Sequence, residues 1–179
     1  MKKTMCAFLR GINVNGKNMK MADICDVFRQ EPVDHVRSVL ATGNILFESS
    51  LSKSELRSIL ESAISRHYQS NESIFIKDLN EIDAILRGIP FTSEPDLHIY
   101  VFICEIGFES VLMERFQSIT PITNEKALIY GNQFYWQVSK GKTLDSGFSK
   151  ILADKKLKSQ FTSRNINTIQ KINEKMRAV

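Results

Sequence analysis

Cysteine and histidine are scarce in this 179-residue chain, which has three of each. The cysteines are odd in number and far apart, they form no Cys-x-x-Cys pair, and the histidines show no metal-ligand spacing. Each cysteine falls in an apolar strand or on an apolar helix face, a setting typical of a buried structural thiol. We therefore expect neither a metal site nor a cofactor.

Long hydrophobic runs are also missing. No stretch approaches the roughly 20 apolar residues that a membrane-spanning helix needs. The chain begins like a signal peptide, but Arg10 follows only five apolar or small residues, Met5 to Leu9, and a secretory hydrophobic segment is longer. The sequence predicts a cytoplasmic protein without a membrane partner.

Charge is nearly balanced over the whole chain, at a formal +4, but not at its C-terminal end. Residues 140–179 hold ten Lys or Arg and three Asp or Glu, whereas residues 1–139 hold 14 and 17. A basic segment of this kind can attract nucleic acid or phosphate groups. Helices with solvated lysine faces have the same composition, so both interpretations stay open.

Hydrophobic periodicity in the first half predicts the order β-α-β-β-α-β. A Gly-Asn turn at 43–44 indicates a hairpin, and Ser52 with Glu55 forms a capping-box pattern at the start of the second helix. The expected strands are 4–9, 36–40, 45–47 and 73–77, and the expected helices are 20–28 and 52–64. This order is that of the split βαβ, or ferredoxin-like, unit.

The second half predicts a similar series. A capping pattern at 78–81 starts a helix, and the two prolines in 88–96 indicate a domain boundary. Strands are expected at 97–104, 127–130 and 134–138, with helices at 108–119, at 148–152 and from Asn165 onward. We predict an α+β fold of two tandem ferredoxin-like subdomains with antiparallel sheets, residues 1–90 and 91–179, the second ending in a helix.

The stretch Arg10–Asn18 joins the first strand to the first helix and is rich in glycine, asparagine and cations. Gly11, Gly16 and Lys17 match the phosphate-loop spacing, and backbone N–H groups before a helix suit an anion. Asn18 replaces the hydroxyl residue that would coordinate magnesium, and a hairpin follows instead of a parallel crossover, so NTPase chemistry is not expected. A plain turn with solvated cations is the alternative interpretation.

A second polar cluster, Thr162–Thr168, precedes the last helix. An arginine with Asn and Thr side chains at a helix start can bind an anion, although capping by Thr162, Ser163 or Asn165 explains the same residues. Our hypothesis is that both clusters form one anion-binding pocket, in which the two arginines clamp oxygens. The predicted ligand-binding residues are Arg10, Asn13, Gly16, Lys17, Asn18, Arg164, Asn165 and Asn167.

Four stretches resemble the motifs of one family. Leu9–Asp23 is similar to its leading Leu-Arg-Gly-Ile-Asn-Val-Gly-Gly-Lys-Asn motif, and Thr42–Phe47 is similar to its Ser-Gly-Asn hairpin. Gly88–Phe91 resembles its Pro-Phe stretch, and Thr162–Thr168 resembles its terminal Arg-Asn-Trp-Asn-Thr motif, with Ile166 in place of the tryptophan. The chain thus resembles the bacterial domain of unknown function 1697 family. The resemblance implies two ferredoxin-like subdomains and a cytoplasmic protein, and no activity, cofactor or catalytic residue.

The residues favour a protein that binds a phosphate-containing ligand, a nucleotide or nucleic acid, at the Arg10–Asn18 loop. The alternatives are a small enzyme acting on a phosphorylated metabolite and a protein-interaction module with no small ligand. The loop contains no carboxylate for general base chemistry, and Asp23 is the nearest one downstream. Binding is therefore favoured over catalysis.

Overall fold

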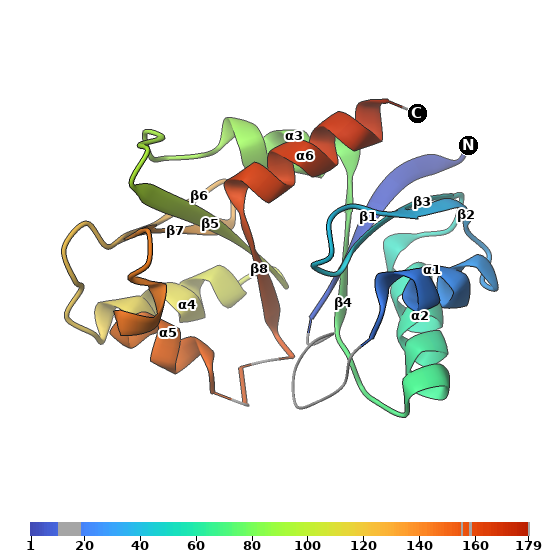
Figure 1. Ribbon diagram of the computed structural model, residues 1–179, viewed down its shortest axis with the longest axis horizontal. Helices are drawn as coiled ribbons and strands as arrows, with labels where there is room; N and C mark the ends of the chain where they lie inside the picture. The colour runs from blue at the N-terminus through green and yellow to red at the C-terminus, as the bar shows by residue number, and fades with distance from the viewer. Residues whose placement is uncertain (11–18, 155, 158, 179) are drawn as a thin grey trace. The chain divides into compact units, whose positions relative to one another are not determined.

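The computed structural model describes residues 1–10, 19–154, 156, 157 and 159–178. It contains two compact units, one formed by Met1–Ile82 with Lys171–Val179 and the other by Asp83–Gln170 (Figure 1). The division into domains of residues 1–90 and 91–179 stays a prediction. Helices α3 (Leu79–Arg87) and α6 (Ile166–Arg177) each contribute residues to both units.

The first unit holds a four-stranded antiparallel sheet in the order β2-β3-β1-β4. Helices α1 (Met21–Arg29) and α2 (Lys53–Tyr68) follow the first and third strands, as the sequence predicted. The strands are β1 (Lys3–Leu9), β2 (Asp34–Ser38), β3 (Asn44–Ser49) and β4 (Ile74–Asp78).

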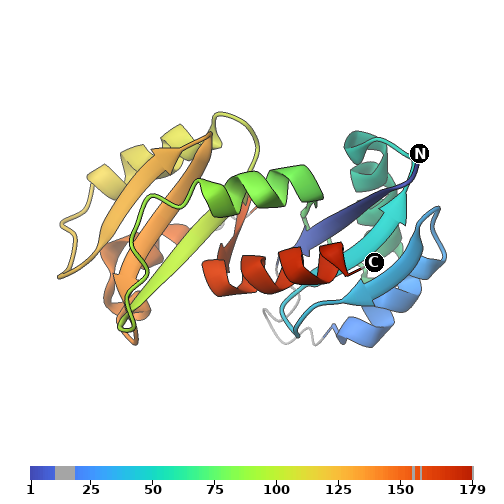
Figure 2. The same ribbon diagram turned by 90° about the horizontal axis from the view of Figure 1, so that it is seen from above.

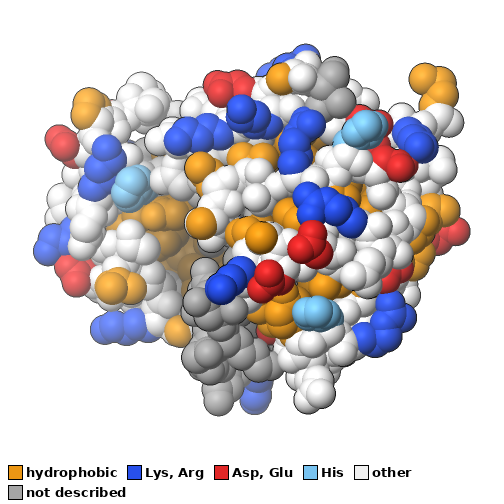
Figure 3. Space-filling view, turned by 45° about the vertical axis from the view of Figure 1, so that its right-hand side comes forward, with side chains coloured by type: hydrophobic (Ala, Val, Ile, Leu, Met, Phe, Trp, Pro, Cys, Tyr) orange, Lys and Arg blue, Asp and Glu red, His pale blue; other side chains and the backbone are white. Residues whose placement is uncertain are grey.

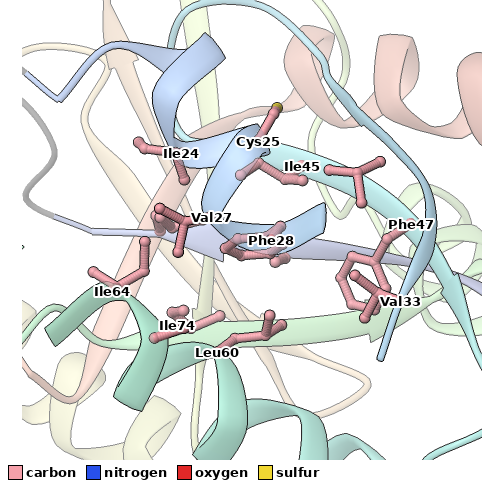
Figure 4. Close-up of a cluster of buried hydrophobic side chains, with 14 of the residues drawn as sticks. Ile24, Cys25, Val27, Phe28, Val33, Ile45, Phe47, Leu60, Ile64 and Ile74 are labelled. Carbon is pink, nitrogen blue, oxygen red and sulfur yellow. The ribbon is translucent and has the colours of Figure 1, made fainter. Parts of the chain in front are cut away.

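Alternate strand residues of this sheet face the two helices and form the core of the unit. Figure 4 shows Phe28 of α1 at the centre of this cluster, with Ile45 of β3, Leu60 of α2 and Ile74 of β4 around it. The Phe28 ring meets Phe47 edge to face, with 6.1 Å between the centroids. Burial of one face of α1 therefore fixes the helix that follows the Arg10–Asn18 loop.

The second unit repeats this arrangement with the order β6-β7-β5-β8, again antiparallel throughout (Figure 2). Helix α4 (Phe108–Gln117) follows β5, and the short helix α5 (Gly147–Leu152) follows β7 and a 3-10 turn, η1 (Thr143–Asp145). The strands are β5 (Leu97–Cys104), β6 (Lys126–Tyr130), β7 (Gln133–Ser139) and β8 (Phe161–Asn165).

Strand β8 corrects the sequence analysis, which placed residues 162–164 at a helix start. The segment Phe161-Thr-Ser-Arg-Asn165 carries no apolar alternation, and its pairing with β5 supplies the hydrogen bonds that make it a strand. Helix α6 begins at Ile166, so the prediction that Asn165 opens the last helix is confirmed. The coarse fold is therefore a mixed α/β structure with two four-stranded antiparallel sheets and a C-terminal helix.

Both predicted capping patterns are present. Ser52 and Glu55 form a reciprocal capping box at the start of α2. At the start of α3, Asp78 N donates to Glu81 Oε2 at 2.8 Å and Glu81 N donates to Asp78 Oδ1 at 3.1 Å. Lys53 Nζ lies 3.0 Å from Asp78 Oδ2, which joins the two caps. Within the described residues, none of the helices combines the length and apolar character required to span a bilayer.

Tyr135 of β7 is completely buried, and its hydroxyl donates to the Ile85 carbonyl at 2.8 Å. Burial, with a smaller effect of Tyr130, raises the pKa of Tyr135 to about 12. Because the folded-state pKa exceeds the unfolded value of about 10, the stabilisation is complete below pH 10 and is lost as the pH rises toward 12. Between these values the free energy of unfolding should fall by about 1.4 kcal/mol per pH unit from this group.

Urea unfolding of the parent and of Tyr135→Phe between pH 9 and pH 12 tests this prediction. The variant should be less stable at neutral pH by about 1 kcal/mol, because the Ile85 carbonyl loses its donor. This difference should shrink above pH 10 and then reverse, because the parent loses more than about 1 kcal/mol before pH 12. Tyr130→Phe, at a residue that is 60% exposed, is the control: it removes only the smaller contribution to the pKa of Tyr135, so the stability of this variant should still fall above pH 10. A constant difference between parent and Tyr135→Phe across this range would contradict the prediction.

Candidate functional site

Arg10 stands where the chain leaves β1, held between the two strands that flank β1. Leu9 N donates to the Gly43 carbonyl at 2.8 Å, and Arg10 N donates to the Ser73 carbonyl at 3.3 Å. The Arg10 side chain is half-buried, and this burial lowers the pKa of Arg10. The start of the predicted ligand loop is therefore anchored on both sides. Asn13, Gly16, Lys17 and Asn18 lie outside the described residues.

The Thr42-Gly-Asn44 turn is held by hydrogen bonds of its own Asn44 side chain, which gives these residues a structural role. Asn44 is completely buried, and its side-chain amide donates to the Val39 carbonyl at 3.1 Å and to Thr42 Oγ1 at 2.9 Å. Gly43 has a φ of +73°, a conformation that glycine adopts at little cost. The turn thus presents the Gly43 carbonyl to Leu9, next to Arg10.

Arg164 and Asn165 are adjacent in β8, and strand geometry directs them to opposite faces of the second sheet. Arg164 Nη1 donates to Thr162 Oγ1 at 2.7 Å and to the Ser163 carbonyl at 2.8 Å, so this nitrogen is used within its own strand. The sequence analysis treated Arg164, Asn165 and Asn167 as one cluster. The structure brings Asn165 and Asn167 together and directs Arg164 elsewhere.

Asn165 links the first turn of α6 to strand β5. Its Oδ1 accepts a hydrogen bond from Asn167 N at 2.9 Å, which is a helix cap, and its Nδ2 lies 3.0 Å from His98 Nδ1. Because Oδ1 is the acceptor, the amide nitrogen donates and His98 Nδ1 must carry a lone pair. The ring proton of the neutral imidazole then sits on Nε2.

A pocket of about 280 Å³ lies at this junction, between the start of β5 and the start of α6. Its polar lining residues are Ser93, Glu94, His98, Lys140, Asn165 and Asn167, and the other lining residues are apolar. Lys140 and Asn167 are exposed, whereas Asn165 and His98 are half-buried. The pocket therefore offers an ammonium group, side-chain amides and one carboxylate to a small polar ligand.

The sequence matches the family described as "Protein of unknown function (DUF1697)" over residues 1–135. The chain belongs to this DUF1697 family. None of the curated proteins compared is similar to the chain. The fold is similar to the structure of a conserved bacterial protein from Streptococcus pneumoniae, with a TM-score of 0.79, 23% sequence identity, and coverage of 98% of this chain and 99% of the other.

The DUF1697 match includes the Arg10–Asn18 loop, the Thr42–Asn44 turn and Gly88, and it stops before β8. Arg164, Asn165 and Asn167 therefore lie outside the matched residues. Within them, Gly88 has a structural role, because a Cβ there would lie 3.0 Å from Tyr130 Cδ1 and 3.0 Å from the Tyr135 hydroxyl. A side chain at this position would disturb the Tyr135 hydrogen bond.

Sequence analysis missed the three titratable residues of the pocket, namely Glu94, His98 and Lys140. His98 comes near Asn165 only because β5 pairs with β8, with Tyr100 opposite Asn165. Lys140 follows β7, and its backbone N donates to the Asp96 carbonyl at 2.9 Å, which places it beside the start of β5. A correct prediction of β8 would have placed His98 near Asn165.

Proposed function

We propose that the chain binds a phosphate-containing ligand, a nucleotide or a nucleic acid, through the Arg10–Asn18 loop and the pocket that contains Asn165 and Asn167. The observation that carries the proposal is this pocket, where Lys140 and two side-chain amides surround a space of about 280 Å³. Phosphate oxygens accept hydrogen bonds from all of these groups. That Arg10 and Arg164 share one pocket stays a prediction.

The half-buried guanidinium of Arg10 supports an anionic ligand at the loop. Arginine keeps its charge in proteins, and a partly desolvated charge is less screened by salt than an exposed one. An anion beside Arg10 would therefore interact with a charge that salt screens only weakly.

On one face of the molecule, the distribution of charge favours a small ligand over a long nucleic acid (Figure 3). On the face in Figure 3, Lys and Arg side chains are interspersed with Asp and Glu. Extended nucleic-acid surfaces gather cations on one face or stripe.

We also propose that each unit is a ferredoxin-like subdomain in a bacterial, cytoplasmic protein. The element order β-α-β-β-α-β and the two equivalent strand orders support the fold assignment. Cys6, Cys25 and Cys104 carry free thiols, which persist in a reducing compartment.

The alternative function is that of a small enzyme acting on a phosphorylated metabolite. The carboxylate of Glu94 and the imidazole of His98 support this alternative. Both line the pocket that contains Lys140, and they are the residue types that perform general acid–base catalysis. Conversion of a phosphorylated metabolite, lost in His98→Ala and in Glu94→Gln, would favour this alternative over binding alone.

Calorimetric titration with inorganic phosphate, AMP, ADP and a short single-stranded RNA tests the proposal. We expect Lys140→Ala and Lys17→Ala each to weaken binding of the best ligand by about tenfold, the typical effect of losing one charge-assisted contact. Lys150→Ala, which removes an exposed lysine of α5, is the matched control and should bind like the parent.

Titrations at two salt concentrations identify the ligand class. Affinity for RNA should fall steeply with salt, whereas affinity for a pocket-bound nucleotide should change much less. Equal affinity in the parent and in both lysine variants would refute the proposed sites.

A further inference from the structure

Strand β6 is an edge strand with an unusually apolar, exposed sequence, Lys126-Ala-Leu-Ile-Tyr130. Leu128, Ile129 and Tyr130 are 46%, 38% and 60% exposed. β6 pairs with β7 alone among the described strands, through five consecutive residue pairs without a bulge. Exposed, regular, apolar edge strands are templates for pairing with another strand.

The equivalent strand of the first unit, β2, is protected in the ways that natural edge strands usually are. It has the same place in its strand order, but its sequence is Asp34-His-Val-Arg-Ser38. Its register shifts between Asp34 and Arg37, and His35 adopts a φ of +51°. Charges and irregularities of this kind prevent edge-to-edge pairing, and β6 has only Lys126 to serve this purpose.

The backbone of β6 offers a defined set of free hydrogen-bonding groups. Gly131 and Asn132, with φ of +55° and +60°, form the two-residue turn to β7. The pair that flanks such a turn, Tyr130 with Gln133, exchanges both backbone hydrogen bonds, and hydrogen-bonded pairs then alternate along the ladder. The N–H and C=O groups of Ala127 and Ile129 therefore point away from β7.

We propose that β6 pairs antiparallel with β6 of a second copy of this chain, about a two-fold axis at Leu128. In this register Ala127 exchanges its backbone hydrogen bonds with Ile129 of the partner subunit. Centring on Leu128 is the only choice that pairs all five residues of the strand. The two sheets become one continuous sheet across the interface.

The side chains of β6 are complementary to themselves in this register. Leu128 faces Leu128 of the partner subunit across the axis, where cross-strand side chains approach closely. Lys126 lies beside Tyr130 of the partner subunit, so the only charge of the strand faces an aromatic ring instead of another lysine. The Tyr130 ring packs against Gly88, where a Cβ would lie 3.0 Å from Tyr130 Cδ1, and this close packing positions the ring.

Sedimentation velocity of the full chain from about 1 to 100 μM tests the proposal, because a dimer with a Kd near 10 μM is largely formed at the upper limit. We expect the parent to dimerise and Leu128→Lys to raise the dissociation constant at least about tenfold, since like charges then oppose each other at the axis. Ile106→Lys, at a residue that is 93% exposed outside β6, is the control and should dimerise like the parent.

A charge-swap experiment identifies the occupant as a second copy. Leu128→Glu alone should be monomeric, and an equimolar mixture with Leu128→Lys should form a heterodimer, because opposite charges then face each other. Formation of the heterodimer also establishes that both variants fold. A parent that stays monomeric at about 100 μM would overturn the proposal. An extended segment of another protein would then be the expected partner of β6. Dimerisation of the parent that Leu128→Lys does not weaken, or a mixture that stays monomeric, would also overturn it.

Discussion

Glu125→Leu is expected to lower the free energy of unfolding by about 3 kcal/mol or more, because it leaves two buried donors and one partly buried donor without an acceptor. Glu125 precedes β6 and is only 5% exposed. Its Oε1 accepts from Trp136 Nε1 at 3.0 Å and from the Ser146 hydroxyl. Its Oε2 accepts from Ile122 N at 2.9 Å.

The carboxylate also orients the start of α5. Ser146 is fully buried, and its hydroxyl oxygen accepts from Phe148 N at 3.0 Å, which caps the helix. The same hydroxyl donates its hydrogen bond to Glu125 Oε1. Removing the carboxylate therefore disturbs a cap in addition to leaving donors unpaired.

Two variants separate the network from general effects of the substitution. Glu125→Gln keeps one acceptor oxygen and the side-chain volume, so it should lose about half as much stability, with its amide nitrogen facing Ile122 N. Glu114→Leu, at an exposed glutamate of α4, should be nearly neutral. Urea unfolding followed by circular dichroism measures all three. A loss below about 1 kcal/mol in Glu125→Leu would mean that the network contributes little.

The sequence predicted the first unit well because its signals are local. The apolar spacing of Ile24, Cys25 and Phe28 predicts a helix face directly, and all three are buried. Ser52 with Glu55 identifies a helix start from two residues three positions apart. Such patterns depend only on near neighbours in the chain, so they can be read without knowing the tertiary structure.

The parts that sequence analysis missed depend on contacts between distant residues. The segment 161–165 is polar and short, and only its pairing with β5 makes it a strand. Because side chains alternate along β8, Arg164 and Asn165 point to opposite faces of the sheet. Three polar residues close together in the sequence do not reveal this separation. Lys140 joins the pocket for the same reason, because its backbone N donates to the Asp96 carbonyl, 44 positions earlier in the chain.

Phe28→Ala is expected to destabilise the first unit by about 3–5 kcal/mol, the usual effect of removing a large aromatic side chain from a core. Phe28 is completely buried, and it lies in a cluster with residues of α1, α2, β3 and β4 of the same unit (Figure 4). Each unit has its own hydrophobic core, so we predict that the second unit stays folded when the first one unfolds.

The chain offers a built-in reporter for this prediction. Its single tryptophan, Trp136, lies in β7 of the second unit. In Phe28→Ala, far-UV circular dichroism should show an early urea transition that tryptophan fluorescence does not show. The control is Phe102→Ala, which removes a completely buried ring from the second core and should shift the fluorescence transition instead. Coincident transitions of both signals in both variants would mean that the units unfold as one cooperative structure, because independent units respond separately.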